Sequence, residues 1–520
     1  MSVATTLSRV TGFIRTWATA YALGATALAA SYNVANNIPN MIFELVAGGI
    51  LSALFIPTYL EVKTQEGEDA AWRFASHVLN LSVLALGVVA VIGIVLPQPF
   101  VWTQTFRLPP EGSAGVRDMA NFFFRIFAIQ VVIYGGGMIV QGLLNAQRRF
   151  LWTALGPVFN NLVVIATMLG AAAIGAGSNT GLLLLAAGTT AGVVAMFAAM
   201  TPDIIRSGMR YYPELGLSDP RVRRMLTLAL PAVLYVITNL VAVSFRNASA
   251  FAVSENGPSI VMYAWNFYQL PYGILAVALA TAVFTELSES AGKHDMAEFK
   301  QHLSHGLRTT GVLILPSAAA LAVLARPLVS LYRAGAFSAE AVAPVSSALR
   351  FWSVTLIFYA AMMFVLRAFY SLKDTLTPAL VNLVMTVVQV ALYWALTTGF
   401  GAWPGLGING IPIADAIFYV SMLIALVALL RKKIGAFDLR SVVATFVKMS
   451  VASLCGGAAA YGIALFAEPL AAGVTGSLLA AGSGGAMCFA VALGIGAILG
   501  VEEVRSVAVM GKRLLSKKRP

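Results

Sequence analysis

Charged side chains within long apolar stretches are the residues of this sequence best suited to chemistry. Arg9 and Arg15 lie in the first apolar stretch, and Glu44 lies in the second. A charge inside a bilayer costs roughly 2.5–3.5 kcal/mol on insertion scales, so it tends to face a water-filled cavity or a partner. The planar fork of a guanidinium matches the oxygens of phosphates and carboxylates. The pattern therefore predicts an anion-binding site within a membrane.

A structural interpretation of the same charges is also open. Arg9 is close to the N-terminus and could reach the near membrane surface. Glu44 could pair with Arg9 or Arg15 and only hold the first two stretches together. Arg246 and Arg350 lie near the outer ends of later stretches, which favours an interfacial position for both. The remaining polar residues at depth are Arg125, Asn266 and Asp415.

Glu44 and Asp415 are the carboxylates deep enough in apolar sequence to bind a proton or Na⁺. No glycine-rich phosphate loop followed by Lys-Ser/Thr is present, so an ion gradient, the membrane potential or the substrate gradient would drive any transport. His302 and His305 lack an acidic or cysteine partner at ligand spacing, and no cluster of acids and bases suggests catalysis. We expect no metal site, no cofactor and no enzyme.

The composition requires a polytopic membrane protein. Of 520 residues, 59% are hydrophobic and 11% are charged, against about 25% charged in soluble domains. The net charge of +12 is concentrated in alternate loops, the positive-inside pattern, and this argues against nucleic acid as a partner. The same pattern predicts that both termini are cytoplasmic.

Apolar segments of spanning length predict an all-α architecture of about fourteen transmembrane helices. A weak internal repeat relates 154–163 to 375–384 and 37–39 to 269–271. It predicts two parallel six-helix lobes, a transporter architecture. The predicted parts are a first lobe at 1–210, a second at 211–435, two additional helices at 436–505 and a basic tail at 506–520. The predicted spans are 4–24, 33–60, 76–97, 118–145, 152–174, 180–202, 223–247, 258–287, 304–326, 343–370, 376–399, 409–431, 440–466 and 474–500.

Several segments carry a resemblance to a known family. The most specific is Arg367-Ala368-Phe369-Tyr370, followed by Asp374-Thr375 and Thr377-Pro378. With 8–15, 38–61, 141–161 and 269–288, it resembles the MurJ (MviN) family of lipid II flippases, which lies within the superfamily of multidrug, oligosaccharidyl-lipid and polysaccharide exporters. The resemblance implies two lobes around a cationic cavity, with the last two helices as an addition.

The resemblance also implies roles for individual residues. Arg9 and Arg15 match two functional arginines of the family's first span, and Asn382 matches an asparagine of a proposed Na⁺ site. Other positions depart from the family's pattern: Thr16, Ala30, Phe43-Glu44, Asn266 and Thr386 stand where it has other residues. The candidate substrate-binding residues are Arg9, Arg15, Glu44 and Asn266. The candidate residues for Na⁺ or H⁺ coupling are Glu44, Asp415 and Asn382.

The resemblance implies a flippase that moves undecaprenyl-pyrophosphate-linked peptidoglycan precursor across the bacterial cytoplasmic membrane by alternating access. The expected partners are a lipid-linked substrate, membrane lipids and peptidoglycan-synthesis proteins. The departures leave three alternatives open. These are a flippase for another polyprenyl-linked oligosaccharide, a small-solute or drug antiporter, and a scaffold for cell-wall enzymes that transports nothing.

Overall fold

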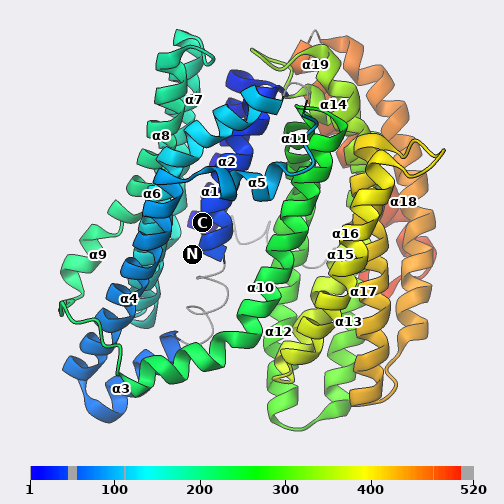
Figure 1. The fold of residues 1–520 in the computed structure, drawn as a ribbon. Coiled ribbons are helices and arrows are strands. Elements are labelled where there is room, and N and C mark those ends of the chain that lie inside the picture. The colour runs from blue at the N-terminus through cyan, green and yellow to red at the C-terminus, as the bar shows by residue number, and fades with distance from the viewer. Residues whose placement is uncertain (1, 45–54, 111–112, 472, 505–520) are drawn as a thin grey trace, which may run out of the picture. The chain divides into compact units, whose positions relative to one another are not determined.

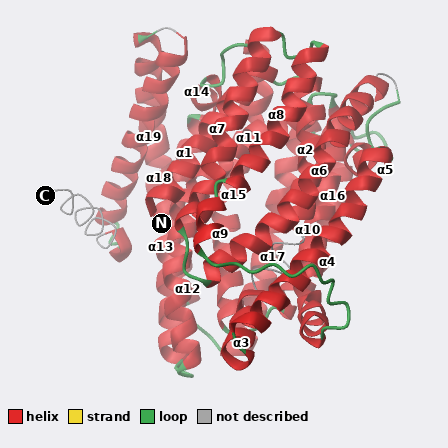
Figure 2. Ribbon diagram, turned by 90° about the vertical axis from the view of Figure 1, so that its left-hand side faces the viewer, coloured by secondary structure: helices red, strands yellow, loops and turns green. Residues whose placement is uncertain are grey.

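Every regular element of the part of the chain described here is a helix. The computed structural model describes residues 2–44, 55–110, 113–471 and 473–504. Figures 1 and 2 show long helices joined by short links, with no strand among the described residues. The all-α prediction is therefore confirmed. The predicted basic tail at 506–520 and the middle of the predicted span 33–60 lie outside the described residues.

The predicted number of fourteen spans is not confirmed. Eleven described helices are long and apolar enough to cross a membrane, and a bent helix pair makes twelve. The helices described within the first two predicted spans do not qualify because they are rich in polar residues, and the second predicted span continues into residues that are not described. Helix α1 (Ser2–Leu23) contains Arg9 and Arg15, and α2 (Ala27–Glu44) contains four asparagines and ends at Glu44.

The chain divides into two compact units. Unit 1 comprises residues 1–259 with 335–337, and unit 2 comprises 260–334 with 338–520. This division assigns α10 to unit 1, whereas the internal repeat puts a lobe boundary at residue 210. The repeat-based boundaries stay a prediction.

Unit 1 is built around α6, which packs on α2, α4 and α8, while α1 packs on α7. Its core includes Tyr32, whose ring meets Phe123 and Phe127 edge-on at centroid distances of 5.5 and 5.6 Å. Gly24 (φ 62°) makes the turn between α1 and α2, and a Cβ there would lie 2.3 Å from the carbonyl oxygen of Ala336. The remaining helices are α3 (Ile56–Glu66), α4 (Glu68–Val95), α5 (Gln98–Thr105), α6 (Ser113–Ala146), α7 (Leu151–Ile174), α8 (Asn179–Ala198), α9 (Thr201–Arg206) and α10 (Pro220–Val253).

Unit 2 is built around α13, which packs on α12, α15, α18 and α19. The two predicted additional helices correspond to α18 and α19, and they approach closely because glycine and alanine line their contact. A Cβ on Gly456 would lie 2.5 Å from the carbonyl oxygen of Cys488. The helices are α11 (Gly257–Pro271), whose first turn belongs to unit 1, and α12 (Val277–Gly292), α13 (Met296–Val323), α14 (Ala325–Ser330), α15 (Ala339–Ser371), α16 (Leu376–Thr398), α17 (Gly410–Ile434), α18 (Leu439–Ala467) and α19 (Gly473–Ile498).

One span of unit 2 is broken. A single π-helical turn, Tyr272–Ala276, follows Pro271 between α11 and α12, and the two helices are bent by 43°. Proline removes a backbone donor and wide π-turns re-aim the helix that follows. The Leu-Pro motif of the sequence is therefore the physical cause of this bend.

Candidate functional site

The polar residues of α2 form one stripe along the helix. Asn33 is followed by the adjacent pair Asn36 and Asn37, then by Asn40 and Glu44, at steps of three or four residues, so all five share one face. The asparagines are half-buried and Glu44 is exposed, whereas the opposite face, with Tyr32 and Val34, is buried in unit 1. The stripe is therefore available to a polar ligand, although α2 lies among apolar helices.

Arg15 of α1 is half-buried next to two phenol rings. Its charge acts on the hydroxyls of Tyr32 in α2 and Tyr134 in α6. The Tyr32 hydroxyl also shares a 2.7 Å hydrogen bond with Oγ1 of Thr189 in α8. Two neutral phenols can orient a guanidinium but cannot neutralise it, so Arg15 keeps its positive charge. It is suited to binding an anion.

Arg9 lies in the same helix in a different environment. Its side chain is exposed, one helical turn and a half before Arg15. Asn161 of α7 holds this part of α1 in place, because its Nδ2 donates to Thr11 Oγ1 at 3.0 Å and to the Ser8 carbonyl at 3.3 Å. Arg9 is thus an exposed cation on a helix that is anchored by a neighbour.

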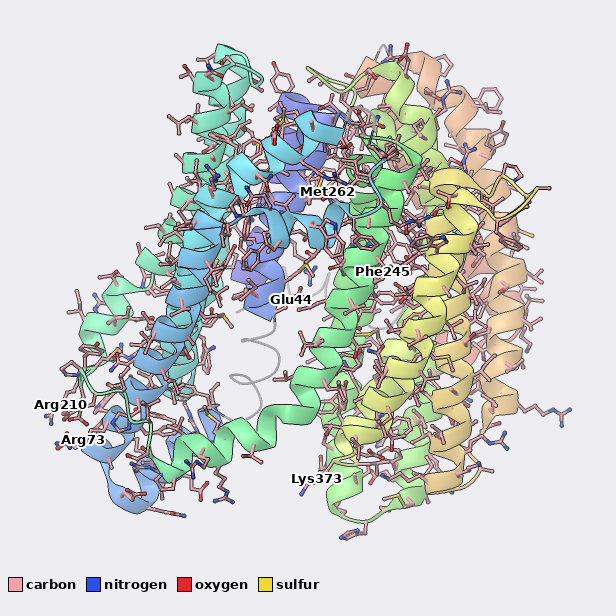
Figure 3. The ribbon with its side chains drawn as sticks, in the orientation of Figure 1. Glu44, Arg73, Arg210, Phe245, Met262 and Lys373 are labelled. Carbon is pink, nitrogen blue, oxygen red and sulfur yellow. The ribbon has the colours of Figure 1, made fainter. Side chains whose placement is uncertain are left out.

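The charge recorded as acting on Glu44 belongs to Arg246 of α10, not to Arg9 or Arg15. Figure 3 labels Glu44 at the end of α2 and Phe245, the residue before Arg246, on α10. The predicted pairing of Glu44 with Arg9 or Arg15 of α1 has no ion pair to support it in the described part of the chain, and the charge that acts on Glu44 comes from α10. Arg246 is half-buried, and the sequence did not suggest this partner.

A buried hydrogen-bonded contact joins α10 to α5 next to this charge pair. Gln104 of α5 is fully buried; its Nε2 donates to Ser244 Oγ, and its Oε1 accepts from Asn247 Nδ2, both at 2.7 Å. Arg107 donates to Ser249 Oγ at 2.8 Å. Because these amides and hydroxyls satisfy one another, α10 can be released from α5 only when water or a ligand replaces them.

Asp415 of α17 forms the second polar centre, and it is inside unit 2. The side chain is 1% exposed. One carboxylate oxygen accepts from Trp352 Nε1 at 2.8 Å, and the other accepts from Gln389 Nε2 at 2.8 Å and from the Tyr393 hydroxyl. All three recorded donors are neutral. This arrangement stabilises a carboxylate by hydrogen bonds in a dry environment. Binding of a proton or a small cation there would neutralise the carboxylate and strongly change the strength of these hydrogen bonds.

Three of these four residues were missed at the sequence level, although a signal for two of them exists. The buried face of α16 is polar, since Asn382, Thr386, Gln389 and Tyr393 follow one another at intervals of three or four residues. In a membrane helix such a stripe marks the face turned away from lipid. Trp352 lies in α15 and carries no comparable signal.

The other candidate residues are not among the recorded hydrogen-bond partners of these two centres. Asn382 is 2% exposed on the polar face of α16. Asn266 is half-buried in α11, directly after Trp265, whose ring meets that of Trp352 at 5.3 Å. Arg125 and Arg350 are exposed. No group of three or more metal-ligating side chains occurs in the part of the chain that the structure describes.

The link between α9 and α10 is fastened to α4 by charges outside the apolar segments. His77 of α4 contacts Asp219 at 3.0 Å and Glu214 at 3.3 Å, and Arg221 binds Asp219 at 2.9 Å. Partial burial raises the pKa of Asp219, but hydrogen bonds from Arg221 and His77 outweigh it and bring the pKa down to about 2. Figure 3 labels Arg73 and Arg210 at the same end of unit 1; Arg73 lies over the Tyr212 ring at 5.0 Å, and Arg210 pairs with Asp69 at 2.6 Å.

Comparison with known proteins identifies the family. The model of the family described as lipid II flippase MurJ matches residues 19–481. The chain belongs to the MurJ family. A lipid II flippase MurJ from Burkholderia cenocepacia is 30% identical over 397 residues, which are 75% of this chain and 76% of that protein. A probable lipid II flippase MurJ from Rhizobium meliloti is 29% identical over 427 residues, 80% of this chain and 76% of the other.

A solved structure supports the same fold. The chain matches a lipid II flippase MurJ in an inward closed conformation with a TM-score of 0.76 and 20% sequence identity, over 98% of this chain and 99% of the other. The MurJ family match begins at residue 19, so it includes Glu44, Asn266, Asn382 and Asp415 but begins after Arg9 and Arg15. The case for the two arginines therefore depends on their surroundings in α1.

Proposed function

We propose that this chain is a transporter that translocates lipid II, the undecaprenyl-pyrophosphate-linked peptidoglycan precursor, across the bacterial cytoplasmic membrane by alternating access. The observation that carries the proposal is the MurJ family match over residues 19–481. The relatives from Burkholderia cenocepacia and Rhizobium meliloti are named as a lipid II flippase and a probable one. The apolar helices place the activity within a membrane, and we propose that both termini are cytoplasmic.

The arginines of α1 would hold the pyrophosphate. Arg15 keeps its charge beside Tyr32 and Tyr134, and Arg9 is exposed on the same helix. Guanidinium–phosphate hydrogen bonds are charge-assisted and are worth about 1.5–3 kcal/mol each. The asparagine stripe of α2 would supply neutral donors and acceptors to the sugar and peptide of the headgroup, and Asn266 of α11 is a further candidate contact.

The carboxylates would couple transport to an ion. Asp415 is held by three neutral donors, so a proton or Na⁺ that binds it must rearrange Trp352, Gln389 or Tyr393. Glu44 would couple differently, since its interaction with Arg246 links α2 to α10. Asn382, on the polar face of α16, is the third candidate for ion coupling.

The test is complementation of a bacterium depleted of its own lipid II flippase. Expression of this chain should restore growth and restore lipid II accessibility at the outer leaflet. The Arg15→Ala variant should fail at equal membrane abundance, whereas Arg350→Ala, which removes an exposed arginine, should restore both. Failure of the wild-type chain with the protein confirmed in the membrane would reject lipid II as its substrate.

The departures from the family's pattern favour a second candidate, transport of another polyprenyl-linked oligosaccharide. Phe43-Glu44 and Asn266 stand where the family has arginines, and the charge of Arg246 acts on Glu44. Mass spectrometry should identify the lipid that co-purifies with the wild-type chain and is absent from purified Arg15→Ala. Its headgroup distinguishes lipid II from another polyprenyl-linked oligosaccharide. We also propose peptidoglycan-synthesis proteins as partners, to be sought by crosslinking in the same cells.

A further inference from the structure

A cavity of about 390 Å³ lies at one end of unit 2, between the first turns of α13 and the link from α17 to α18. Six of its lining residues are Lys300, Gln301, Ser304, Arg308, Phe437 and Asp438. The lining combines two cations, one carboxylate, an amide and a hydroxyl with an aromatic ring. Such a mixture of convergent polar groups with an apolar wall is typical of sites for small ligands.

The charged residues of this cavity differ in whether another side chain or backbone group already binds them. Arg308 binds Glu503 at 2.6 Å and Ser441 Oγ at 2.7 Å, so it is held in place. The carboxylate of Asp438 accepts from the backbone N–H of Ser441 as the cap of α18. Lys300 is half-buried, and no carboxylate of the described residues lies within ion-pair distance of it. Its ammonium therefore supplies positive charge to the cavity.

Ser304 is an independent indication of a ligand. Its side chain is 4% exposed and lines the cavity, yet its hydroxyl has no hydrogen-bond partner within the described part of the chain. Buried hydroxyls are almost always paired, because an unpaired one loses its bonds to water without compensation. An acceptor such as a phosphate oxygen in the cavity would satisfy it.

The surroundings indicate where such a ligand comes from. A second cavity of about 370 Å³, lined by Arg431 and Lys432, adjoins the first, and both include Ala436. Clustered lysines and arginines repel one another unless an anion lies between them. Helices α13, α17 and α18 all pass the length and hydropathy test for membrane spans. Basic pockets at the ends of such helices are suited to the headgroups of anionic lipids.

We propose that this cavity is a phosphate-binding site that an anionic phospholipid fills from the membrane with its headgroup. The Lys300 ammonium and the Ser304 hydroxyl bind the phosphate, and Arg308, whose position is fixed by Glu503, lines the cavity beside them. Phe437 packs against the glycerol end. The site is independent of the proposed lipid II contacts, which involve α1, α2 and α11.

The test uses the full-length protein in nanodiscs of phosphatidylcholine with a graded fraction of phosphatidylglycerol, and native mass spectrometry counts the retained anionic lipid. Lys300→Gln should lower apparent affinity roughly tenfold, because it removes one charge-assisted hydrogen bond. Ser304→Ala should lower it about threefold. Lys293→Gln is the matched control: it removes an exposed cation that is paired with Glu289 at 2.7 Å, and it should leave affinity unchanged.

Three outcomes would overturn the proposal. Equal retention by Lys300→Gln and Lys293→Gln would mean that bulk surface charge, and not the cavity, attracts the lipid. Full displacement of phosphatidylglycerol by millimolar inorganic phosphate would identify a site for soluble phosphate instead of lipid. A Lys300→Arg variant that does not recover binding, with an unchanged melting temperature, would exclude charge as the cause of the Lys300→Gln defect.

Discussion

The two polar centres of this protein handle charge in opposite ways. In unit 1, Arg9 is exposed, Arg15 is half-buried beside two phenols, and Glu44 is exposed under the influence of Arg246. In unit 2, Asp415 is 1% exposed and receives hydrogen bonds from three neutral donors. The first centre leaves donors available to a ligand, whereas the second is already saturated. The centre in unit 1 is therefore suited to binding and releasing a large anion, and the centre in unit 2 is suited to holding one buried charge.

The difference also concerns what each centre contributes to stability. Removing a half-exposed arginine allows water to replace its contacts, so the fold loses little. Removing a buried carboxylate leaves its donors unsatisfied in a dry environment, and the fold loses the full cost of their desolvation. Substitutions at the two centres should therefore separate activity from stability.

The largest effect is expected for Asp415→Ala. This variant orphans the donors on Trp352, Gln389 and Tyr393, and it should lower the free energy of unfolding by about 3–5 kcal/mol. Thermal or denaturant unfolding in detergent measures the loss. Asp415→Asn keeps an acceptor in place, so it should cost about 1–2 kcal/mol. If Asp415 is the coupling residue, Asp415→Asn should fold and also abolish the dependence of transport on pH or Na⁺.

Unchanged stability in Asp415→Ala would contradict the saturated hydrogen-bond arrangement.

The second-largest effect is expected for transport activity when Arg15, in the polar centre of unit 1, is replaced. Arg15→Ala should lower transport by roughly tenfold to a hundredfold, because one charge-assisted contact to the substrate's phosphate is lost. Its melting temperature should stay within a few degrees of the wild type, and Arg15→Lys should recover part of the activity, since lysine keeps the charge without the fork. Arg125→Ala is the matched control on an exposed arginine. A large stability loss with proportionate activity loss would mean that Arg15 has a structural role instead.

The sequence predicted the fold better than the details of the site. Apolar length and low charge were sufficient for the helical class, because a bilayer requires every backbone group to be paired within the segment. The number of spans stays a prediction, because α1 and α2 are too polar to qualify by hydropathy and the second predicted span runs into residues outside the described part of the chain. The family, by contrast, was predicted from motifs such as 367–370, and the comparison confirmed it.

The partners within the site could not be predicted in the same way. Arg246 lies about two hundred residues after Glu44, and no local pattern indicates that α10 meets α2. The Asp415 cluster combines residues of three helices, of which only α16 shows a polar periodicity. Pairing across a fold depends on tertiary packing, so sequence can name the charged residues but not their partners.

The third prediction tests the link between Glu44 and Arg246. Single substitutions Glu44→Gln and Arg246→Gln should each change transport, and the double variant should be less impaired than the product of the two effects. We expect a coupling energy of about 0.5–1 kcal/mol, since Glu44 is exposed and water screens the pair. A double-mutant cycle on transport rate measures it. Strict additivity would mean that the charges of Glu44 and Arg246 act separately.

The smallest effect is expected for Asp219, a carboxylate that is paired with Arg221 and His77 close to solvent. The pKa of Asp219 is about 2, below its ordinary value of 3.8, because Arg221 and His77 donate to it against the effect of its partial burial. The charged form therefore stabilises the link between α9 and α10 above pH of about 4, and this contribution is lost as the pH falls toward about 2. Because solvent screens these charges, the contribution of the Asp219 carboxylate to stability should amount to less than about 1 kcal/mol. Hydrogen-exchange protection at the start of α10, taken relative to the intrinsic exchange rate at each pH, should fall as the pH drops over that interval in the wild type and stay constant in Asp219→Asn. A pH response of Asp219→Asn equal to that of the wild type would assign the change to another group. A response as large as the loss in Asp415→Ala would show that charged partners make a carboxylate as important to the fold as dry burial does.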